Sequence, residues 1–311
     1  MVSVVLPTYN EEDNIERVYE EVKNVLLPEG IECELVYVDD GSSDNSFEII
    51  KRLAESVDDI KITGISFSKN FGKEAAILAG LSHAGGEVCV IMDCDLQHPP
   101  EVLPEMYHLW EKGYEIIEGV KRTRGKENPL YRAFAKLFYK LITKSTGVNM
   151  ERASDFKMMD RKVVDEYIKL PERNIFFRAL SSWMGYKCAS VEFDVKERVS
   201  GKTKWSLDGL FKYAIGSICS FSTAPMQLIT LSGVFFFFFA LVLGIQSLAK
   251  WFSGNALEGF TTVIILILIV GSLIMISLGI IGYYLAKIYE EIKGRPRYIV
   301  DNVIDNSINI S

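Results

Sequence analysis

The first part of the chain alternates short apolar runs with longer segments in which apolar residues recur every three or four positions. Five runs have the length of single strands: VSVVLP, CELVYVD, IKITGIS, EVCVIMD and YEIIEGV. Between the first two, apolar residues at 15, 18, 19, 22 and 25 predict an amphipathic helix capped by Asn10, and residues 44–55 and 73–84 predict two more helices. Strands that alternate with helices predict an α/β domain with a mainly parallel sheet. Further along, a helix is expected after Asp155 and a strand at CASVEFDV.

Two stretches near the carboxyl end have a different pattern. Residues 213–249 and 259–286 contain no Asp, Glu, Lys or Arg. Each is longer than the roughly 20 apolar residues that a bilayer-spanning helix needs. They predict transmembrane helices at 225–250 and 259–287, preceded by an interfacial amphipathic helix at 205–224. The predicted organisation is completed by a cytosolic domain at 1–204 and a cytosolic tail at 288–311.

The distribution of charge predicts an orientation. The net charge of −7 disfavours nucleic acid as a partner, because a phosphate backbone binds basic surfaces. Lysines and arginines flank the outer ends of the two apolar stretches, whereas the loop between them has only Lys250 and Glu258. The positive-inside rule then places both chain ends and the large domain in the cytoplasm, with two spans in the cytoplasmic membrane. The five cysteines have no metal-binding spacing and are expected to be reduced.

Polar residues follow the predicted strands at the point where each strand ends. The runs are PTYNE, DDGSSD, SKNFGK, DCDLQH and KR. Any one of them is also typical of a solvated turn, and Asp44 has the position of a helix cap. Because a parallel sheet binds its ligand at the carboxyl ends of its strands, the five runs together predict one site.

The run DCDLQH has the residue types of a metal site. Asp93, Asp95 and the Gln97 carbonyl are hard oxygen donors, which suit Mg²⁺ or Mn²⁺ rather than zinc. These are too few to surround an ion, so substrate phosphates or water would complete its coordination. The chain has neither GxGxxG nor GxxxxGK[ST], which disfavours classical dinucleotide binding and P-loop hydrolysis.

Several motifs occur in an order that resembles a known family. LPTYNEEDNI, VDDGSSDNS, NFGKEAAILAG, MDCDLQHPPE, ASDF and VSGKTKWSL resemble the family 2 glycosyltransferases. The branch is that of the polyprenyl-phosphate enzymes, which includes dolichyl-phosphate mannose synthase and bacterial polyprenyl-phosphate glucosyltransferases. The resemblance covers nearly the whole chain, and two carboxy-terminal spans match the bacterial type. It implies a cytosolic GT-A nucleotide-sugar-binding domain. The absence of QxxRW argues against a processive polysaccharide synthase.

The resemblance also implies roles for individual residues. The nucleotide sugar would be bound by Pro7, Thr8, Tyr9, Glu11, Asp39, Asp40 and Asp93, with Lys73 near the nucleoside. The divalent metal, Mg²⁺ or Mn²⁺, would be held by Asp93, Asp95 and Gln97, and Asp155 would be the catalytic carboxylate together with Asp95. The acceptor phosphate would be bound by Arg122, Arg132, Arg198, Ser200, Lys202 and Lys204.

The predicted reaction is an inverting, metal-dependent transfer of a sugar to polyprenyl phosphate, of the undecaprenyl type, for glycosylation of the cell envelope. UDP-glucose is the favoured donor, with UDP-GlcNAc, GDP-mannose or an aminoarabinose derivative as alternatives. A different class of function is a non-catalytic membrane scaffold. The tail segment RYIV has a strand-like pattern that could pair with a neighbouring subunit, so a homo-oligomer such as a tetramer is a further prediction.

Overall fold

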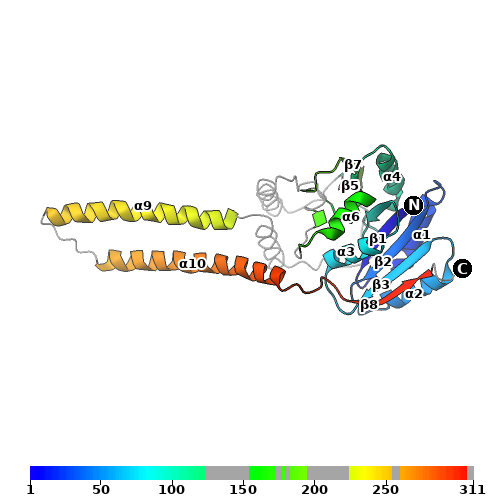
Figure 1. Ribbon diagram of the computed structural model, residues 1–311, viewed down its shortest axis with the longest axis horizontal. Coiled ribbons are helices and arrows are strands. Elements are labelled where there is room, and N and C mark those ends of the chain that lie inside the picture. The colour runs from blue at the N-terminus through cyan, green and yellow to red at the C-terminus, as the bar shows by residue number, and fades with distance from the viewer. Residues whose placement is uncertain (123–153, 173–176, 179–182, 195–223, 254–259, 307–311) are drawn as a thin grey trace. The chain divides into compact units, whose positions relative to one another are not determined.

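The computed structural model describes residues 1–122, 154–172, 177–178, 183–194, 224–253 and 260–306 (Figure 1). The chain divides into two compact units, one formed by Met1–Ser206 with Arg295–Ser311 and the other by Leu207–Gly294. In the described part of the first unit, eight strands form one sheet in the order β7-β5-β6-β4-β1-β2-β3-β8. They are β1 (Val2–Thr8), β2 (Cys33–Asp39), β3 (Lys61–Phe67), β4 (Val88–Ile91), β5 (Ile116–Lys121), β6 (Lys157–Asp160), β7 (Cys188–Phe193) and β8 (Val300–Asp305).

The centre of the sheet is parallel, as the alternation of strands and helices predicts. β1 pairs in parallel with β2 and β4, and β2 pairs in parallel with β3. All five apolar runs of the first part of the chain form strands, and the later run at Cys188 forms β7, parallel to β5. The predicted α/β fold of the large domain is therefore confirmed, as a mixed sheet with a parallel centre.

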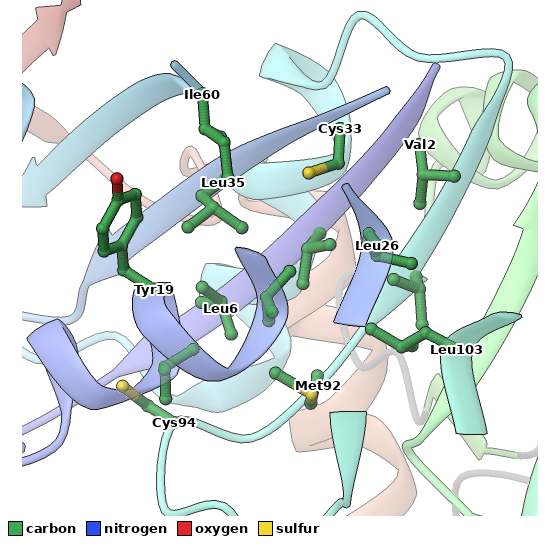
Figure 2. Packing of buried hydrophobic residues seen from close by; sticks show 14 of the residues in the cluster. Val2, Leu6, Tyr19, Leu26, Cys33, Leu35, Ile60, Met92, Cys94 and Leu103 are labelled. Atoms are coloured by element: carbon green, nitrogen blue, oxygen red, sulfur yellow. The ribbon is translucent and has the colours of Figure 1, made fainter. Parts of the chain in front are cut away.

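Helices cover both faces of this sheet. They are α1 (Ile15–Leu26), α2 (Ser46–Ser56), α3 (Lys73–His83), the short η1 (Pro100–Val102), α4 (Leu103–Glu111) and α6 (Arg161–Lys169). On one face, Leu6 and Leu35 of the sheet pack with Tyr19 and Leu26 of α1, and α2 and α4 join the same apolar cluster (Figure 2). On the other face, α3 packs on the alternate residues of β1 and β2, beginning with Val5, and α6 packs beside α3 on β4 and β6. Alternation along each strand thus supplies two cores.

The first helix begins later than its predicted cap. Its buried residues include four of the five predicted positions, Leu26 replacing Val25, but it starts at Ile15 after Asn14. Asn10 instead adopts a left-handed conformation with φ of 55°. Its side-chain oxygen accepts a hydrogen bond from the Ser43 amide at 2.8 Å. Asn10 therefore joins the loops after β1 and β2 rather than capping a helix. Similarly, the residue before α2 is Asn45, although the Asp44 carboxylate does accept the Ser46 amide at 3.0 Å.

The helix expected after Asp155 is present as α6, but an unpredicted strand separates the two. A four-residue strand, β6, comes first, and only then does α6 begin at Arg161. β6 lies inside the sheet, antiparallel to both β4 and β5, with Lys157 opposite Ile91. A run as short as KMMD has no periodicity that separates a strand from a helix. Because β6 is antiparallel to β4, the first residue of β6 lies at the edge of the sheet where β4 ends.

The tail prediction also needs correction. The strand is Val300–Asp305 rather than RYIV, and it pairs with β3 of the same chain in antiparallel register. The Tyr298 ring stacks on Phe67 with centroids 5.0 Å apart, and the Asn306 side chain accepts the Ile62 amide at 2.9 Å. The tail is thereby part of the first unit. The homo-oligomer stays a prediction without support from this segment.

The second unit contains two long helices, α9 (Ala224–Phe252) and α10 (Phe260–Ile292), which run side by side (Figure 1). Within the described residues, Ile229–Gln246 and Leu266–Ile292 are long and apolar enough to cross a membrane. Large apolar side chains such as Phe237, Leu241 and Ile267 are exposed along both helices. Length, composition and exposed apolar surface together indicate membrane association. The predicted interfacial helix at 205–224 falls, except for its last residue, outside the described residues.

Candidate active site

The candidate site lies at the edge where β1, β2 and β4 end. Because these strands are parallel neighbours, the residues that follow them meet: Thr8 pairs with Asp39, and Met92 follows the last residue of β4. β6 runs in the opposite direction, so the segment that precedes it, with Asp155, reaches the same edge. The structure therefore brings together the predicted metal run and the predicted catalytic carboxylate.

Lys73, the first residue of α3, joins these two groups. Its Nζ lies 2.6 Å from Asp93 Oδ1 and 3.0 Å from Asp155 Oδ2. Burial alone would lower the pKa of Lys73, but the charges of Asp93 and Asp155 outweigh that effect and raise it above its ordinary value. Lys73 is therefore a permanent cation between two carboxylates. The sequence placed it near the nucleoside, and its structural contacts are with Asp93 and Asp155.

Asp155 is held on both carboxylate oxygens. Arg178 donates from Nε to Oδ1 at 2.6 Å and from Nη2 to Oδ2 at 2.7 Å, a bidentate pair, and only 7% of Asp155 is exposed. Burial would raise the pKa of this carboxyl, but the hydrogen bonds from Arg178 and the charge of Lys73 hold it well below its ordinary value. Asp155 is thus ionised near neutral pH and is a weak base.

The predicted metal-binding run, Asp93 to His98, forms a turn in which exposed and buried side chains alternate from Asp93 to Gln97. Asp93, Asp95 and Gln97 are half-exposed, whereas the alternate residues Cys94 and Leu96 are buried. Leu96 has a φ of 56°, in the left-handed region, and the Gln97 amide donates to Asp95 Oδ1 at 3.1 Å. The three oxygen-bearing side chains are consequently the ones that a ligand can reach.

This donor set fits a hard divalent cation. Two carboxylates and one carboxamide oxygen match Mg²⁺ or Mn²⁺, which bind few protein groups and complete their coordination with phosphate and water. Among the described residues, no three His, Cys, Asp or Glu side chains form a metal-binding group by themselves. An ion here would depend on Gln97 or on oxygens of the substrate.

His98 stabilises the metal run from within. Its Nδ1 accepts the backbone N–H of Asp93 at 3.2 Å, and its ring stacks on Phe156 with centroids 4.8 Å apart. Burial lowers the pKa of His98, so the ring is neutral and Nδ1 is free to accept. These contacts indicate that His98 holds the turn of the metal run in place.

Asp39 and Asp40, predicted to bind the nucleoside, shape the adjoining loops. Asp40 accepts hydrogen bonds from the Phe71 amide at 2.6 Å and from the Gly72 amide at 2.9 Å. Burial raises the pKa of Asp40 in spite of these two donors. Asp39 accepts from the Ser42 amide and the Ser66 hydroxyl, both at 3.1 Å. Both carboxylates are buried, so their contacts in the structure connect the loops after β2 and β3.

Gly41 completes the junction between the same two loops. It has a φ of 68°, and a Cβ atom at this position would lie 2.5 Å from the Lys69 carbonyl carbon. Backbone atoms cannot move aside as a flexible side chain can, so only glycine fits. This close approach of the two loops sets the position of Lys73 at the start of α3.

The loop after β1 presents one exposed aromatic ring. Tyr9 is 46% exposed, whereas Thr8 is buried and its hydroxyl donates to the Leu6 carbonyl at 3.0 Å. Pro7 is half-buried, and Glu11 accepts from the Asn14 side chain at 2.6 Å. Of the predicted nucleoside residues in this loop, Tyr9 is the one whose side chain is most accessible to a ligand.

The predicted acceptor residues are only partly within the described chain. Arg122 lies just after β5 and forms exposed ion pairs with Asp194 at 3.2 Å and Glu192 at 3.6 Å. Arg132, Arg198, Ser200, Lys202 and Lys204 lie outside the described residues. Their roles stay predictions.

Comparison with known proteins decides the family. Residues 3–168 match the model of the family described as glycosyl transferase family 2. The chain is 38% identical over 304 residues to an uncharacterized glycosyltransferase of Synechocystis sp., with 97% of this chain and 95% of that protein covered. It is 37% identical over 303 residues to the bactoprenol glucosyl transferase of Shigella phage SfV, with 97% and 98% covered.

The chain belongs to glycosyl transferase family 2. A prophage bactoprenol glucosyl transferase homolog of Escherichia coli is a further relative, 36% identical with 97% of this chain and 99% of that protein covered. Among solved structures, the glucosyl-3-phosphoglycerate synthase of Mycobacterium tuberculosis with Mg²⁺ and UDP is 20% identical, at a TM-score of 0.48 over 70% of this chain and 77% of that one.

Two residues of this family 2 glycosyltransferase site were missed in the sequence. Arg178 contacts Asp155 directly, and its only signal is that it is the one charged residue in the apolar run IFFRALSSWMG. Glu74 follows Lys73, and its Oε2 accepts the Phe177 amide at 3.1 Å. Burial, followed by the nearby charge of Asp155, raises the pKa of Glu74 to about 7. Glu74 lies within the motif NFGKEAAILAG, but nothing in the sequence connects it to Phe177, and Arg178 lies in none of the motifs.

Proposed function

We propose that this glycosyltransferase transfers glucose from UDP-glucose to the phosphate of a polyprenyl lipid of the bactoprenol type. The observation that carries the proposal is end-to-end similarity to bactoprenol glucosyl transferases, at 36–37% identity over 98–99% of those proteins. Such similarity includes both the sheet domain and the two apolar helices. The contacts of Lys73 with Asp93 and Asp155 support it, because they join the donor and acceptor parts of one site.

The proposed reaction is a single displacement at the anomeric carbon. An oxygen of the lipid phosphate forms the new bond while the bond to UDP breaks, so an α-linked donor yields a β-linked product. The second pKa of a phosphate monoester is about 6, so the acceptor is largely dianionic near neutral pH and needs little help from a base. The ionised, weakly basic state of Asp155 agrees with an orienting role rather than with strong proton abstraction.

The principal difficulty of this reaction is electrostatic, because two anions must approach each other. Asp93, Asp95 and Gln97 would hold a divalent cation, which when bound offsets the charge that develops on the leaving diphosphate. Lys73 adds a permanent positive charge at the same place. Arg122 and the basic residues predicted in the undescribed segments would bind the acceptor phosphate. Tyr9, the exposed ring at the end of β1, is suited to contact the nucleoside.

A panel of labelled donors tests the proposal. The full chain, in detergent with polyprenyl phosphate, is expected to form a labelled lipid from UDP-glucose at least about tenfold faster than from UDP-GlcNAc, GDP-mannose or a UDP-aminoarabinose derivative. Polyprenol without phosphate is the matched control and should accept no sugar. Transfer from another donor alone would assign the enzyme to a different sugar. A folded protein that transfers none of them would favour the scaffold alternative.

We further propose that α9 and α10 both cross the membrane, with the sheet domain on the cytoplasmic side. The support is the length and apolar composition of the two helices and the concentration of Lys and Arg outside the loop between them. This arrangement keeps the site on the side where nucleotide sugars are made. It also leaves the lipid tail of the acceptor in the bilayer.

Cysteine labelling of intact cells tests that orientation. Ser253, at the end of α9, is replaced by cysteine, and an impermeant maleimide should label Ser253→Cys from outside. Cys188, an exposed native cysteine on β7, is the internal control and should react only after the cells are permeabilised. The reverse pattern would show that the sheet domain faces outward.

A further inference from the structure

The backbone of Arg178 is held in place by contacts other than its pair with Asp155. The preceding residue, Phe177, is fully buried and packs edge-on against Tyr167 of α6, with ring centroids 5.5 Å apart. Its backbone amide donates to Glu74 Oε2 at 3.1 Å. The carbonyl oxygen of Arg178 itself accepts from Lys157 Nζ at 3.2 Å. Three independent contacts therefore fix the backbone from which the guanidinium extends.

Lys157 is an unusual residue to find in such a contact. It is 0% exposed in the central strand β6, and its Nζ lies 2.6 Å from Glu118 Oε1 on β5. Burying an ammonium group costs several kcal/mol unless hydrogen-bond acceptors surround it. The Glu118 carboxylate and the Arg178 carbonyl offset much of this cost for Lys157. The sheet thus carries a buried cation that pairs with Glu118 and also donates to the Arg178 carbonyl.

With its backbone fixed, Arg178 contacts both carboxylate oxygens of Asp155. Oδ1 accepts from Arg178 Nε, and Oδ2 accepts from both Arg178 Nη2 and Lys73 Nζ. A two-point contact to a planar guanidinium determines the plane of the carboxylate, which a single lysine contact does not. The side chain of Arg178 is 38% exposed, whereas that of Asp155 is 9% exposed, so the guanidinium is the more accessible partner of the pair.

We propose that Arg178, braced by Lys157 and Glu74, is the positioning residue that sets the orientation of Asp155 for sugar transfer. The inference rests on the proposed function for the reaction it serves, but the brace is a property of this chain's own residues. A direct role of Arg178 in binding the donor diphosphate is the competing interpretation. The two differ in which measured quantity changes when Arg178 is replaced.

Kinetics of two substitutions separate these interpretations. Arg178→Gln is expected to lower kcat for lipid glucosylation about 100-fold, the scale of a misplaced reacting group, with the Kd for UDP changed by less than about threefold. Arg178→Lys should recover part of kcat, because it keeps the charge but loses the two-point contact. Arg52→Gln, at an exposed position on α2, is the matched control and should behave as wild type. Unchanged kcat, or a loss of UDP affinity that matches the loss in kcat, would overturn the proposal.

A second experiment measures the protonation of Asp155 and does not require the protein to transfer glucose. Water-soluble carbodiimide with an added amine modifies protonated carboxyls, and mass spectrometry can quantify the modification of Asp155 in the full chain. Without Arg178 the pKa of Asp155 should rise, and each unit of rise increases the protonated fraction about tenfold, so we expect about tenfold faster labelling in Arg178→Gln. Unchanged labelling would overturn the proposal. If wild type transferred no glucose, the proposed function would fail while this measurement still decided the positioning role.

The brace is tested by a pair of substitutions at Glu74. Glu74→Ala removes the acceptor of the Phe177 amide and is expected to lower kcat about tenfold, whereas Glu74→Gln keeps an acceptor and should recover most of it. The same order should appear in the labelling of Asp155, with the alanine variant labelled faster. Equal kcat in the two variants would show that the hydrogen bond between Glu74 and the Phe177 amide does not affect the position of Asp155.

Discussion

Replacing Asp155 by asparagine is expected to lower lipid glucosylation by about 10³-fold, the scale on which loss of one group that stabilises charge acts in an active site. The neutral amide cannot satisfy Arg178 and Lys73 together, both of which contact the carboxylate at 2.6–3.0 Å. Arg178 would then lose its bidentate contact with a carboxylate, and Lys73 would keep its contact with Asp93 but lose the charge of Asp155. The measurement is the initial rate of labelled lipid formed from UDP-glucose.

The control for this substitution is Asp165→Asn, which makes the same chemical change at an exposed position on α6. It should retain the wild-type rate. Binding of UDP to the Asp155→Asn variant is also expected to persist, because the predicted nucleoside residues lie after β1 and β2. A rate for Asp155→Asn within about tenfold of wild type would contradict a catalytic role.

Loss of the Asp95 carboxylate should abolish the dependence of transfer on divalent cations. Asp95 is half-exposed in the turn, and its Oδ1 also accepts the Gln97 amide, so Asp95→Ala removes one predicted ligand and loosens the position of another. A metal ion supplies several kcal/mol of charge stabilisation, so we expect a loss of at least about 10²-fold at saturating Mn²⁺. Titration of the rate with Mn²⁺ measures it directly.

A second measurement ties this loss to the metal rather than to folding. Electron paramagnetic resonance should detect Mn²⁺ bound by wild type in the presence of UDP, and little bound by Asp95→Ala. Asp165→Ala, away from the turn, should bind as wild type does. Insertion into the membrane should be equal in all three proteins. Transfer by Asp95→Ala that still requires Mn²⁺ would remove Asp95 from the metal site.

The local pattern of the sequence accounts for most of the site's framework. Apolar runs of five to seven residues followed by polar residues predicted β1, β2 and β4 and the loops at their ends. Parallel strands must end at one edge, so DCDLQH and DDGSSD could be placed together without coordinates. The motif order also indicated the family. These inferences succeeded because strand periodicity and strand ends are local properties.

The contacts that organise the centre of the site are not local. The strand β6 is only four residues long and contains a buried lysine, so its pattern predicts neither a strand nor a core position. It is stable as a strand because β4 and β5 supply hydrogen-bonding partners on both sides and Glu118 pairs with Lys157. Direction matters as well: only an antiparallel strand at that place starts at the edge where β4 ends.

By itself, the sequence determined β1 to β5, the edge of the sheet that carries the polar residues and the side chains that could hold a metal. The tertiary structure alone decided that Asp155 meets Lys73 and Asp93, and that Arg178 meets Asp155. It also decided that the last strand returns to β3 of its own chain. The physical reason is the same in each case: a charged side chain is held by partners from distant segments, and pairing between those segments is set by the whole sheet.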